Sequence, residues 1–415
     1  MPSRRAYLAA LTAALAGCGN ERGQTVSRHQ SATTSPDPTP TETRTEASTP
    51  GAISGQWTHA SADARLTNRV PTPVSEPAQE VWTRDIGIAT VRLAGERLLV
   101  ASSETENGRI RRIGADGEPV WTYRTLGATL GPVVGDSCYV RGRTIGSPSL
   151  RAFTLAADGT EPTERWSRAD ALPAVADADL LVATSYSRDR LLGLAPEDGR
   201  ERWSLDEAAL DVPVDEFSVV ALDEESVFVV VKHGFSVERD ADSRDRWLAA
   251  LDRRSGAARW TVRVSAHRGG GFAVTPDSVV TGDSEGRVES WTRDGTARWR
   301  REFEDGIRRV VVESGGGTLV GVRGQSSRQT VALDRNGGRR WTSDSGGVLA
   351  VGGGTALLGR DSRLTAVDPS TGDDRWTWDV PVPLLDAFPV RVDGESGLLL
   401  AAGEFPEGHT LHLLV

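Results

Sequence analysis

The 415-residue sequence contains little cysteine and almost no lysine. Its only cysteines are Cys18 and Cys138, which are too few for a framework of structural disulfides. Lys232 is the only lysine, so arginine supplies nearly all of the positive charge. Acidic residues outnumber basic ones by 58 to 48, and the formal net charge is −10. We therefore expect no nucleic-acid partner, because phosphate binding needs a basic surface.

The sequence also lacks the motifs of common catalytic and metal sites. It has no His-Glu-x-x-His motif, no Gly-Lys phosphate loop and no calcium-binding loop. Residues 282–286 match the Gly-x-Ser-x-Gly pattern of a nucleophile elbow, but a strand-like run follows where that motif needs a helix. We interpret them as a hairpin turn. His409 and His412 would lie on opposite faces of a strand, so we expect them to share no metal.

The first 17 residues have the order of features of an export signal. The pair Arg4 and Arg5, followed by an apolar stretch too short to cross a bilayer, resembles a twin-arginine signal. Residues 15–18, Leu-Ala-Gly-Cys, resemble the lipobox of prokaryotic lipoproteins, in which the cysteine is lipidated after cleavage. We expect residues 1–17 to be a signal peptide and Cys18 to carry a lipid anchor. A cleaved peptide with an incidental cysteine is the alternative.

Residues 18–55 form a polar segment between the signal and the first predicted strand. From Ser31 to Pro50 the sequence consists largely of Thr, Ser, Pro and Glu and has almost no apolar side chains. Such a segment cannot bury enough surface to offset the loss of chain entropy. We interpret residues 18–55 as a disordered tether that holds the following domain away from the membrane.

Eight tryptophans recur along the rest of the chain, and most of them follow a turn that contains glycine. They are Trp82, Trp121, Trp166, Trp203, Trp260, Trp299, Trp341 and Trp376. Successive members lie 39, 45, 37, 57, 39, 42 and 35 residues apart, so only the fourth interval is long. A period of about 40 residues indicates a repeat architecture.

Each interval contains short apolar runs separated by turns rich in Gly, Asp, Ser and Pro. Residues 356–359, 364–368 and 375–378, for example, are strand-like and are separated by such turns. Four antiparallel strands in about 42 residues make one blade of a β-propeller. We therefore predict an all-β fold for residues 56–415, an eight-bladed β-propeller of four-stranded antiparallel blades.

The two ends of the predicted propeller complement one another. After Trp376 the sequence offers three strands and lacks a fourth, whereas the strand at residues 81–86 precedes the first full unit. Pairing this N-terminal strand with the C-terminal strands would complete the eighth blade and remove two exposed sheet edges.

The repeat resembles the pyrroloquinoline-quinone-type repeat family of eight-bladed propellers. The resemblance covers Trp57 to Val415 and is carried by strand ends such as Ala250-Leu251-Asp252, which lead to Gly-x-x-x-Trp. In that family the blade tryptophan packs between neighbouring sheets. The resemblance therefore implies that the eight tryptophans are core residues and not a ligand cage. The same repeat builds quinoprotein dehydrogenases and also non-enzymatic scaffolds, such as the lipoprotein propeller of the outer-membrane assembly machinery.

The resemblance leaves two functions to weigh. We expect a monomeric, membrane-anchored extracytoplasmic scaffold that binds cell-envelope proteins, with no catalytic, cofactor-binding or metal-binding residues. The alternative is a dehydrogenase that holds pyrroloquinoline quinone and calcium in the central channel, although the adjacent cysteines of many such enzymes are absent. The acidic, arginine-rich composition resembles that of haloarchaeal proteins, and GC-rich coding would also supply the arginines.

Two further features have a structural and a functional interpretation. The insertion from His233 to Arg246 is rich in charged residues. The structural interpretation is a solvated surface loop. The functional alternative is a loop that binds a partner, because propellers bind through loops on one face. Cys138 lies in a strand-like run, and we interpret it as a small buried apolar residue.

Overall fold

The computed structural model describes residues 50–415 except for 103–107, 126, 145–146, 158, 234–245, 265–270, 314, 325–327 and 405–407. Within these described residues the regular structure is almost entirely β-strand, and the only helical element is a short 3-10 turn, η2 (Glu207–Ala209). No helix in this part of the chain is long and apolar enough to cross a membrane. The prediction of an all-β fold is confirmed.

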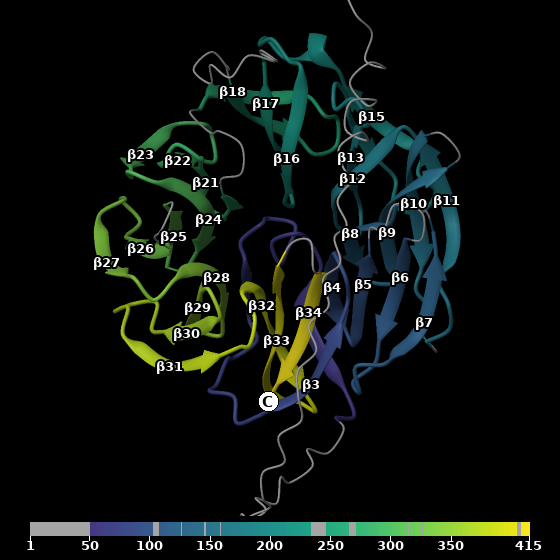
Figure 1. The fold of residues 1–415 in the computed structure, drawn as a ribbon. Helices are drawn as coiled ribbons and strands as arrows, with labels where there is room; N and C mark the ends of the chain where they lie inside the picture. The colour runs from purple at the N-terminus through teal and green to yellow at the C-terminus, as the bar shows by residue number, and fades with distance from the viewer. Residues whose placement is uncertain are drawn as a thin grey trace, which may run out of the picture. The chain divides into compact units, whose positions relative to one another are not determined.

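The hydrogen-bonded ladders divide most strands into eight antiparallel sets of four, which we number as blades 1 to 8, from the inner strand outward (Figure 1). Blade 1 consists of β4 (Ala89–Gly95), β5 (Arg97–Ser102), β6 (Arg109–Ile113) and β7 (Pro119–Arg124), and blade 2 of β8 (Thr129–Val134), β9 (Ser137–Thr144), β10 (Ser147–Thr154) and β11 (Thr163–Ala169). Blade 3 consists of β12 (Ala171–Ala176), β13 (Leu181–Ser185), β14 (Leu191–Leu194) and β15 (Glu201–Leu205), and blade 4 of β16 (Glu216–Leu222), β17 (Ser226–Lys232), β18 (Arg246–Asp252) and β19 (Ala258–Arg263). Blade 5 consists of β20 (Phe272–Val274), β21 (Ser278–Gly282), β22 (Arg287–Thr292) and β23 (Ala297–Glu302), and blade 6 of β24 (Gly306–Val312), β25 (Thr318–Arg323), β26 (Arg328–Leu333) and β27 (Arg339–Ser343). Blade 7 consists of β28 (Gly347–Gly352), β29 (Thr355–Arg360), β30 (Arg363–Val367) and β31 (Asp374–Asp379), and blade 8 of β32 (Leu384–Val392), β33 (Glu395–Glu404), β34 (Gly408–Leu414) and β3 (Glu80–Asp85).

The blades follow one another around a central channel. The inner strand of each blade contacts the inner strand of the next, from β4 through β8, β12, β16, β20, β24 and β28 to β32. The N-terminal strand β3 pairs with β34 and completes blade 8, which confirms the predicted closure. A second closing strand was not predicted. β1 (Ile53–Trp57) begins inside the range that we assigned to the tether and pairs antiparallel with both β32 and β4.

The hydrophobic core lies between the blades. One cluster joins Val182 and Trp203 of blade 3 to Phe217 and Val229 of blade 4, and the other junctions have similar clusters. A middle strand such as β17 is therefore buried on both faces, which explains its continuous apolar sequence. An outer strand such as β11 alternates between exposed and half-buried residues.

The repeated tryptophans occupy equivalent positions between blades. Six of them donate an indole hydrogen bond of 2.8 to 3.2 Å to a backbone carbonyl in the turn between the third and fourth strands of the next blade. These pairs are Trp82 with Ala115, Trp166 with Pro196, Trp203 with Arg253, Trp260 with Arg293, Trp299 with Arg335 and Trp341 with Pro369. In the same turns a glycine with positive φ lies against the indole ring, and a Cβ there would come within 3 Å of it. Trp121 and Trp376 are also buried. Trp82 and Trp203 are buried as well, whereas Trp166, Trp260, Trp299 and Trp341 are half-buried and pack against the hydrophobic clusters between blades.

Candidate functional site

The chain segment that follows β1 lies against one face of the ring of blades. Residues 58–70, here called the collar, contact blades 2 to 7 in turn, and purple chain from this part of the sequence crosses the channel in Figure 1. The contacts are Thr58 O with Val133 N (2.9 Å), His59 Nε2 with Ala176 O (2.8 Å), Ala64 O with Leu222 N (2.9 Å), Arg65 O with Val274 N (2.9 Å), Asn68 Nδ2 with Val310 O (3.3 Å) and Asn68 O with Val351 N (3.0 Å). The short strand β2 (Arg69–Val70) then pairs parallel with β28.

These contacts lie at or near the C-terminal ends of the inner strands. We call this side of the propeller the collar face and the opposite side, where the inner strands begin, the open face. Ala62, Leu66 and Asn68 have left-handed backbone conformations, each of which costs about 1 kcal/mol or more for a residue other than glycine. Contacts with the blades therefore hold the collar in its path.

His59 is the most buried ionisable group of the collar. Its side chain is 4% exposed, and its ring also lies 2.8 Å from the Thr58 hydroxyl. Burial lowers the pKa of His59 to about 4, the hydrogen bond with Ala176 opposes this shift, and the nearby charge of Arg92 adds to it. His59 is therefore neutral at pH 7.

Arg92, on the inner strand of blade 1, is buried and bonded to the protein backbone. Its guanidinium donates to Gly131 O (3.0 Å) and Leu130 O (3.1 Å) of blade 2 and to Val91 O (2.8 Å). Burial lowers the pKa of Arg92 to about 10, which still leaves it charged at pH 7. Arg92 therefore links two blades beside the channel.

A second arginine forms an ion pair across blades 6 to 8. Arg309 contacts both carboxylate oxygens of Asp386, at 2.8 and 3.2 Å, and also bonds Leu349 O. Burial opposes the charged form, but the charge and hydrogen bonds of Asp386 raise the pKa of Arg309. Asp386 also acts electrostatically on Arg92. One carboxylate thus balances two arginines near the channel.

The open face beside blade 6 has an excess of positive charge. Arg308 lies at the start of β24, and Arg323 and Arg328 are cross-strand partners at the adjoining ends of β25 and β26. Partial desolvation and the charges of Arg323, Arg309 and Arg328 lower the pKa of Arg308, whereas Asp386 opposes this shift. This arginine group would attract an anion at the channel mouth.

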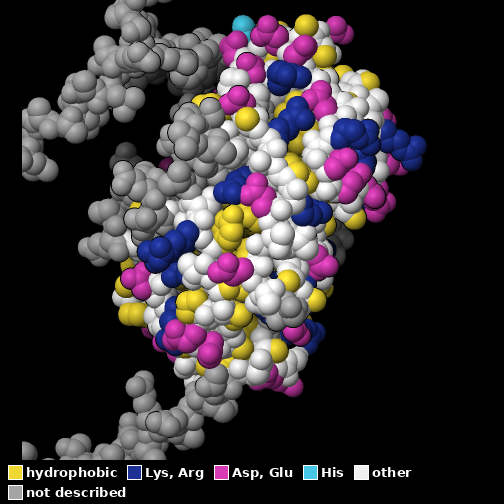
Figure 2. All heavy atoms as spheres, turned by 90° about the vertical axis from the view of Figure 1, so that its right-hand side faces the viewer, with side chains coloured by type: hydrophobic (Ala, Val, Ile, Leu, Met, Phe, Trp, Pro, Cys, Tyr) yellow, Lys and Arg dark blue, Asp and Glu magenta, His cyan; other side chains and the backbone are white. Residues whose placement is uncertain are grey.

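The remaining surface carries charges of both signs. Acidic and basic side chains are interspersed on the side of the molecule seen in Figure 2. Among the described residues, no group of three or more His, Cys, Asp or Glu side chains is placed to hold a metal ion.

The structure places several residues that the sequence analysis singled out. Residues 283–286 connect β21 to β22, so the serine motif is a hairpin turn as predicted. Cys138 is buried, and burial raises the pKa of its thiol to about 12. His412 is 2% exposed and bonds the Glu80 carboxylate at 2.9 Å across the closing strand pair β3–β34. His412 therefore belongs to the ring closure.

Other predicted features lie outside the described residues. These are Arg4, Arg5 and Cys18, most of the tether, and residues 234–245 of the insertion. The strands that flank the insertion are described, and Lys232 pairs with Arg246 where β17 ends and β18 begins, at the open face.

The sequence analysis missed the charged residues near the channel. Arg92, Arg309 and Asp386 each interrupt an apolar inner strand, and this interruption was the available signal. Arg309 and Asp386 also sit beside β-bulges, which re-aim side chains in a way that strand alternation does not predict.

Comparisons with known proteins agree with this architecture. The family described as outer membrane protein assembly factor BamB matches residues 67–247, 244–383 and 327–404. BamB from Moraxella catarrhalis has a similar structure, with a TM-score of 0.56 and 16% identity, over 81% of this chain and 99% of that one. A europium-containing methanol dehydrogenase matches with a TM-score of 0.66 and 12% identity, over 87% of this chain and 98% of that one.

A quinohemoprotein alcohol dehydrogenase from Comamonas testosteroni matches with a TM-score of 0.63 and 11% identity, over 87% of this chain and 80% of that one. No curated protein sequence matches this chain. At these low identities the solved structures establish the propeller fold alone.

Proposed function

The chain belongs to the family of the outer membrane protein assembly factor BamB, and from this premise we propose that it is a lipid-anchored extracytoplasmic scaffold that binds envelope proteins. The proposal rests on one observation: the charged side chains near the channel form hydrogen bonds and ion pairs with the protein itself. Arg92, Arg309 and Asp386 bond to neighbouring blades, so they stabilise the ring. Groups engaged in this way are poorly suited to bind a substrate.

We propose that partners bind at the open face, because the collar occupies the opposite face of the propeller. Of the three large apolar side chains that are exposed among the described residues, Tyr186 (54%) and Ile88 (40%) lie in links at this face, whereas Val120 (51%) lies at the start of β7, toward the collar face. The insertion that follows Lys232 also begins there. Exposed aromatic side chains are enriched at protein interfaces, and binding loops gather on one face of a scaffold.

A photo-crosslinking experiment on the full-length chain in native membranes tests this orientation. A crosslinkable residue is placed at position 186, and a matched one is placed at the exposed position 225 on the collar face. We expect adducts with a defined envelope protein from position 186 and none from position 225. Equal labelling from both positions, or labelling from position 225 alone, would refute binding through the open face.

The anchor is tested separately with Cys18→Ser. We expect the wild-type chain to sediment with membranes and to incorporate labelled lipid, and the variant to do neither. A variant that remains in the membrane fraction would contradict anchoring through Cys18.

The arginine group at the open channel mouth favours a second candidate, a quinone-dependent dehydrogenase. Arg308, Arg323 and Arg328 would suit the carboxylates of pyrroloquinoline quinone. The donors for a calcium ion fit less well, because the carboxylate of Asp386 is already paired with Arg309. Reconstitution with the quinone and calcium tests this candidate, since stoichiometric quinone absorbance with dye-linked alcohol oxidation would favour the enzyme over the scaffold.

A further inference from the structure

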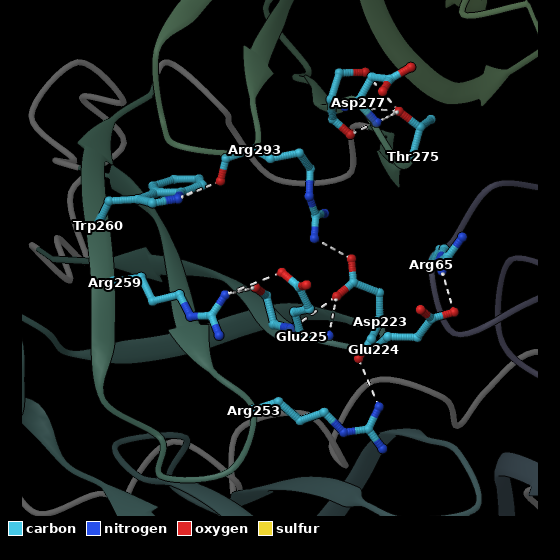
Figure 3. A network of polar contacts seen from close by, with 12 residues as sticks. Arg65, Asp223, Glu224, Glu225, Arg253, Arg259, Trp260, Thr275, Asp277 and Arg293 are labelled. Atoms are coloured by element: carbon cyan, nitrogen blue, oxygen red, sulfur yellow. Dashed lines mark hydrogen bonds and ion pairs between the residues drawn. The ribbon is translucent and has the colours of Figure 1, made fainter.

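Arginines bridge two consecutive blade junctions on the collar face. Figure 3 shows the second junction, at which Arg293 contacts Asp223. Arg253 of blade 4 reaches back to the carboxylate of Asp177 in blade 3 at 2.6 Å and donates to Asp223 O at 2.8 Å. Arg293 of blade 5 reaches back in the same way to the carboxylate of Asp223 in blade 4. Both arginines lie in the turn that accepts the indole hydrogen bond from the preceding blade.

The two aspartates occupy the same position in equivalent turns. Asp223 Oδ1 accepts hydrogen bonds from the backbone N–H groups two and three residues later, at 3.0 and 2.9 Å, and Asp177 does the same at 3.0 and 3.0 Å. In blade 5 this position is Thr275, whose hydroxyl accepts from Asp277 N (3.3 Å) and Ser278 N (3.0 Å). The turn is preserved, but the carboxylate is missing.

The arginine that would meet this carboxylate is present in blade 6. Arg335 O accepts the indole hydrogen bond of Trp299 at 3.0 Å, as Arg253 and Arg293 do for their tryptophans. The Arg335 side chain makes no ion pair with any carboxylate that the structure describes, and the residue is exposed. In contrast, the paired side chains of Arg253 and Arg293 are 12% and 25% exposed.

A cavity of about 880 Å³ lies at this third junction, between blades 5 and 6 and the collar. Arg65, Arg69 and Arg298 line it together with Arg335. Its wall also carries hydroxyl groups from several threonines and serines, including Thr275. Its volume falls within the range of small-molecule sites.

Two of the three carboxylates in the cavity wall are already engaged. Asp63 accepts from the backbone and hydroxyl of Thr67, at 3.0 and 2.7 Å, and Glu313 pairs with Arg340. The third, Asp277, is exposed and points away from the paired arginines in Figure 3. The wall thus carries four arginines and three carboxylates, and one of the arginines, Arg65, contacts Glu224 at 3.6 Å. The cavity therefore has a small excess of cationic groups.

We propose that this cavity binds a small hydroxylated anion, namely a sugar that carries a carboxylate or a phosphate group. Its anionic group takes the place beside Arg335 that the carboxylates of Asp177 and Asp223 occupy beside their arginines. The other arginines and the hydroxyl groups of the wall bind the rest of the ligand. This site is separate from the open face and does not depend on the proposed scaffold function.

Isothermal titration calorimetry on the full-length protein tests the site with glucuronate, glucose 6-phosphate, glucose and inorganic phosphate. We expect at least one of the two acidic sugars to bind at least tenfold more tightly than glucose and inorganic phosphate. A preference between the two acidic sugars distinguishes a carboxylate from a phosphate ligand.

The decisive variant is Thr275→Asp, which supplies the missing carboxylate. We expect it to weaken binding at least tenfold and to raise the melting temperature, because the new side chain pairs with Arg335. Arg335→Gln removes an exposed charge and should also weaken binding at least tenfold. Arg254→Gln, the matched control, removes an exposed charge from the equivalent turn of blade 4, outside the cavity, and should bind like the wild type.

The proposal is overturned if neither acidic sugar binds, or if inorganic phosphate binds as tightly as both of them. It is also overturned if folded Thr275→Asp and Arg335→Gln proteins bind like the wild type.

Discussion

The buried histidine of the collar makes the stability of the protein sensitive to mild acid. The folded pKa of His59 is about 4, whereas an unfolded chain has the ordinary value of 6.5. Between pH 6.5 and pH 4 the His59 side chain is mostly protonated in the unfolded state and mostly neutral in the folded state. Stability attributable to His59 therefore falls as the pH drops from 6.5 to 4 and is constant below that range.

The size of the effect follows from the two pKa values. At pH 5 the loss is about 2 kcal/mol, and it approaches about 3 kcal/mol below pH 4. His59→Gln keeps an N–H group that can donate to Ala176 O but cannot titrate. Partial burial raises the pKa values of the Asp63 and Glu313 carboxyls. Their effect on the stability has the opposite sign, is the same in both proteins and cancels in the comparison.

Guanidinium unfolding of the wild type and of His59→Gln at pH 7 and pH 5, at constant ionic strength, measures the difference. We expect the wild type to lose about 2 kcal/mol more than the variant between these pH values. An NMR titration of the histidine side chains gives the pKa of His59 directly. Equal losses in the two proteins, or a folded pKa near 6.5, would refute the reasoning.

Three further predictions concern the ring. Gly256→Ala places a Cβ about 2.7 Å from an indole carbon and should destabilise the protein by about 1–3 kcal/mol in thermal unfolding, whereas Gly394→Ala, with a similar φ and open space, should cost about 1 kcal/mol. Cys138 should resist Ellman's reagent in the folded protein and react after unfolding, because burial raises the pKa of its thiol to about 12; rapid labelling of the native protein would contradict this. Asp386→Asn breaks the ion pair beside the channel and should cost about 2 kcal/mol in guanidinium unfolding, whereas Asp379→Asn, whose pair is exposed, should destabilise the protein much less.

The repeat could be predicted from the sequence because its signals are local. A glycine turn followed by a tryptophan marks the fourth strand of most blades, and alternation with turn residues marks the others. The pairing of residues 81–86 with the C-terminal strands followed from counting strands. The structure confirms that pairing as β3 with β34.

The collar could not be predicted in the same way. Residues 58–70 have no periodicity, and their path is fixed by hydrogen bonds to blades far away in sequence, such as that of Asn68 with Val310, 242 residues later. The charged groups near the channel were hidden for another reason. A β-bulge in β24 sets the face of the strand on which Arg309 lies and so directs it toward Asp386. A bulge of this kind is difficult to predict from the sequence.

The site beside Arg335 could not be identified from the sequence, because its identification requires a comparison of equivalent turns in successive blades. Thr275 is an ordinary turn residue when it is considered alone. Its significance appears only when three successive turns are superposed and their arginine partners are followed.

The pairing of β3 with β34 has a consequence for the synthesis of the chain. A ribosome makes Glu80 more than 300 residues before it makes Leu414, yet these residues face each other in the finished ring. Until the last seven-residue strand has emerged, β3 and β33 each present an unpaired edge, and edges of this kind recruit other chains. The nascent protein therefore exposes two sheet edges until β34 has been made, and deletion of β34 would be more harmful than deletion of a similar number of residues from an exposed turn.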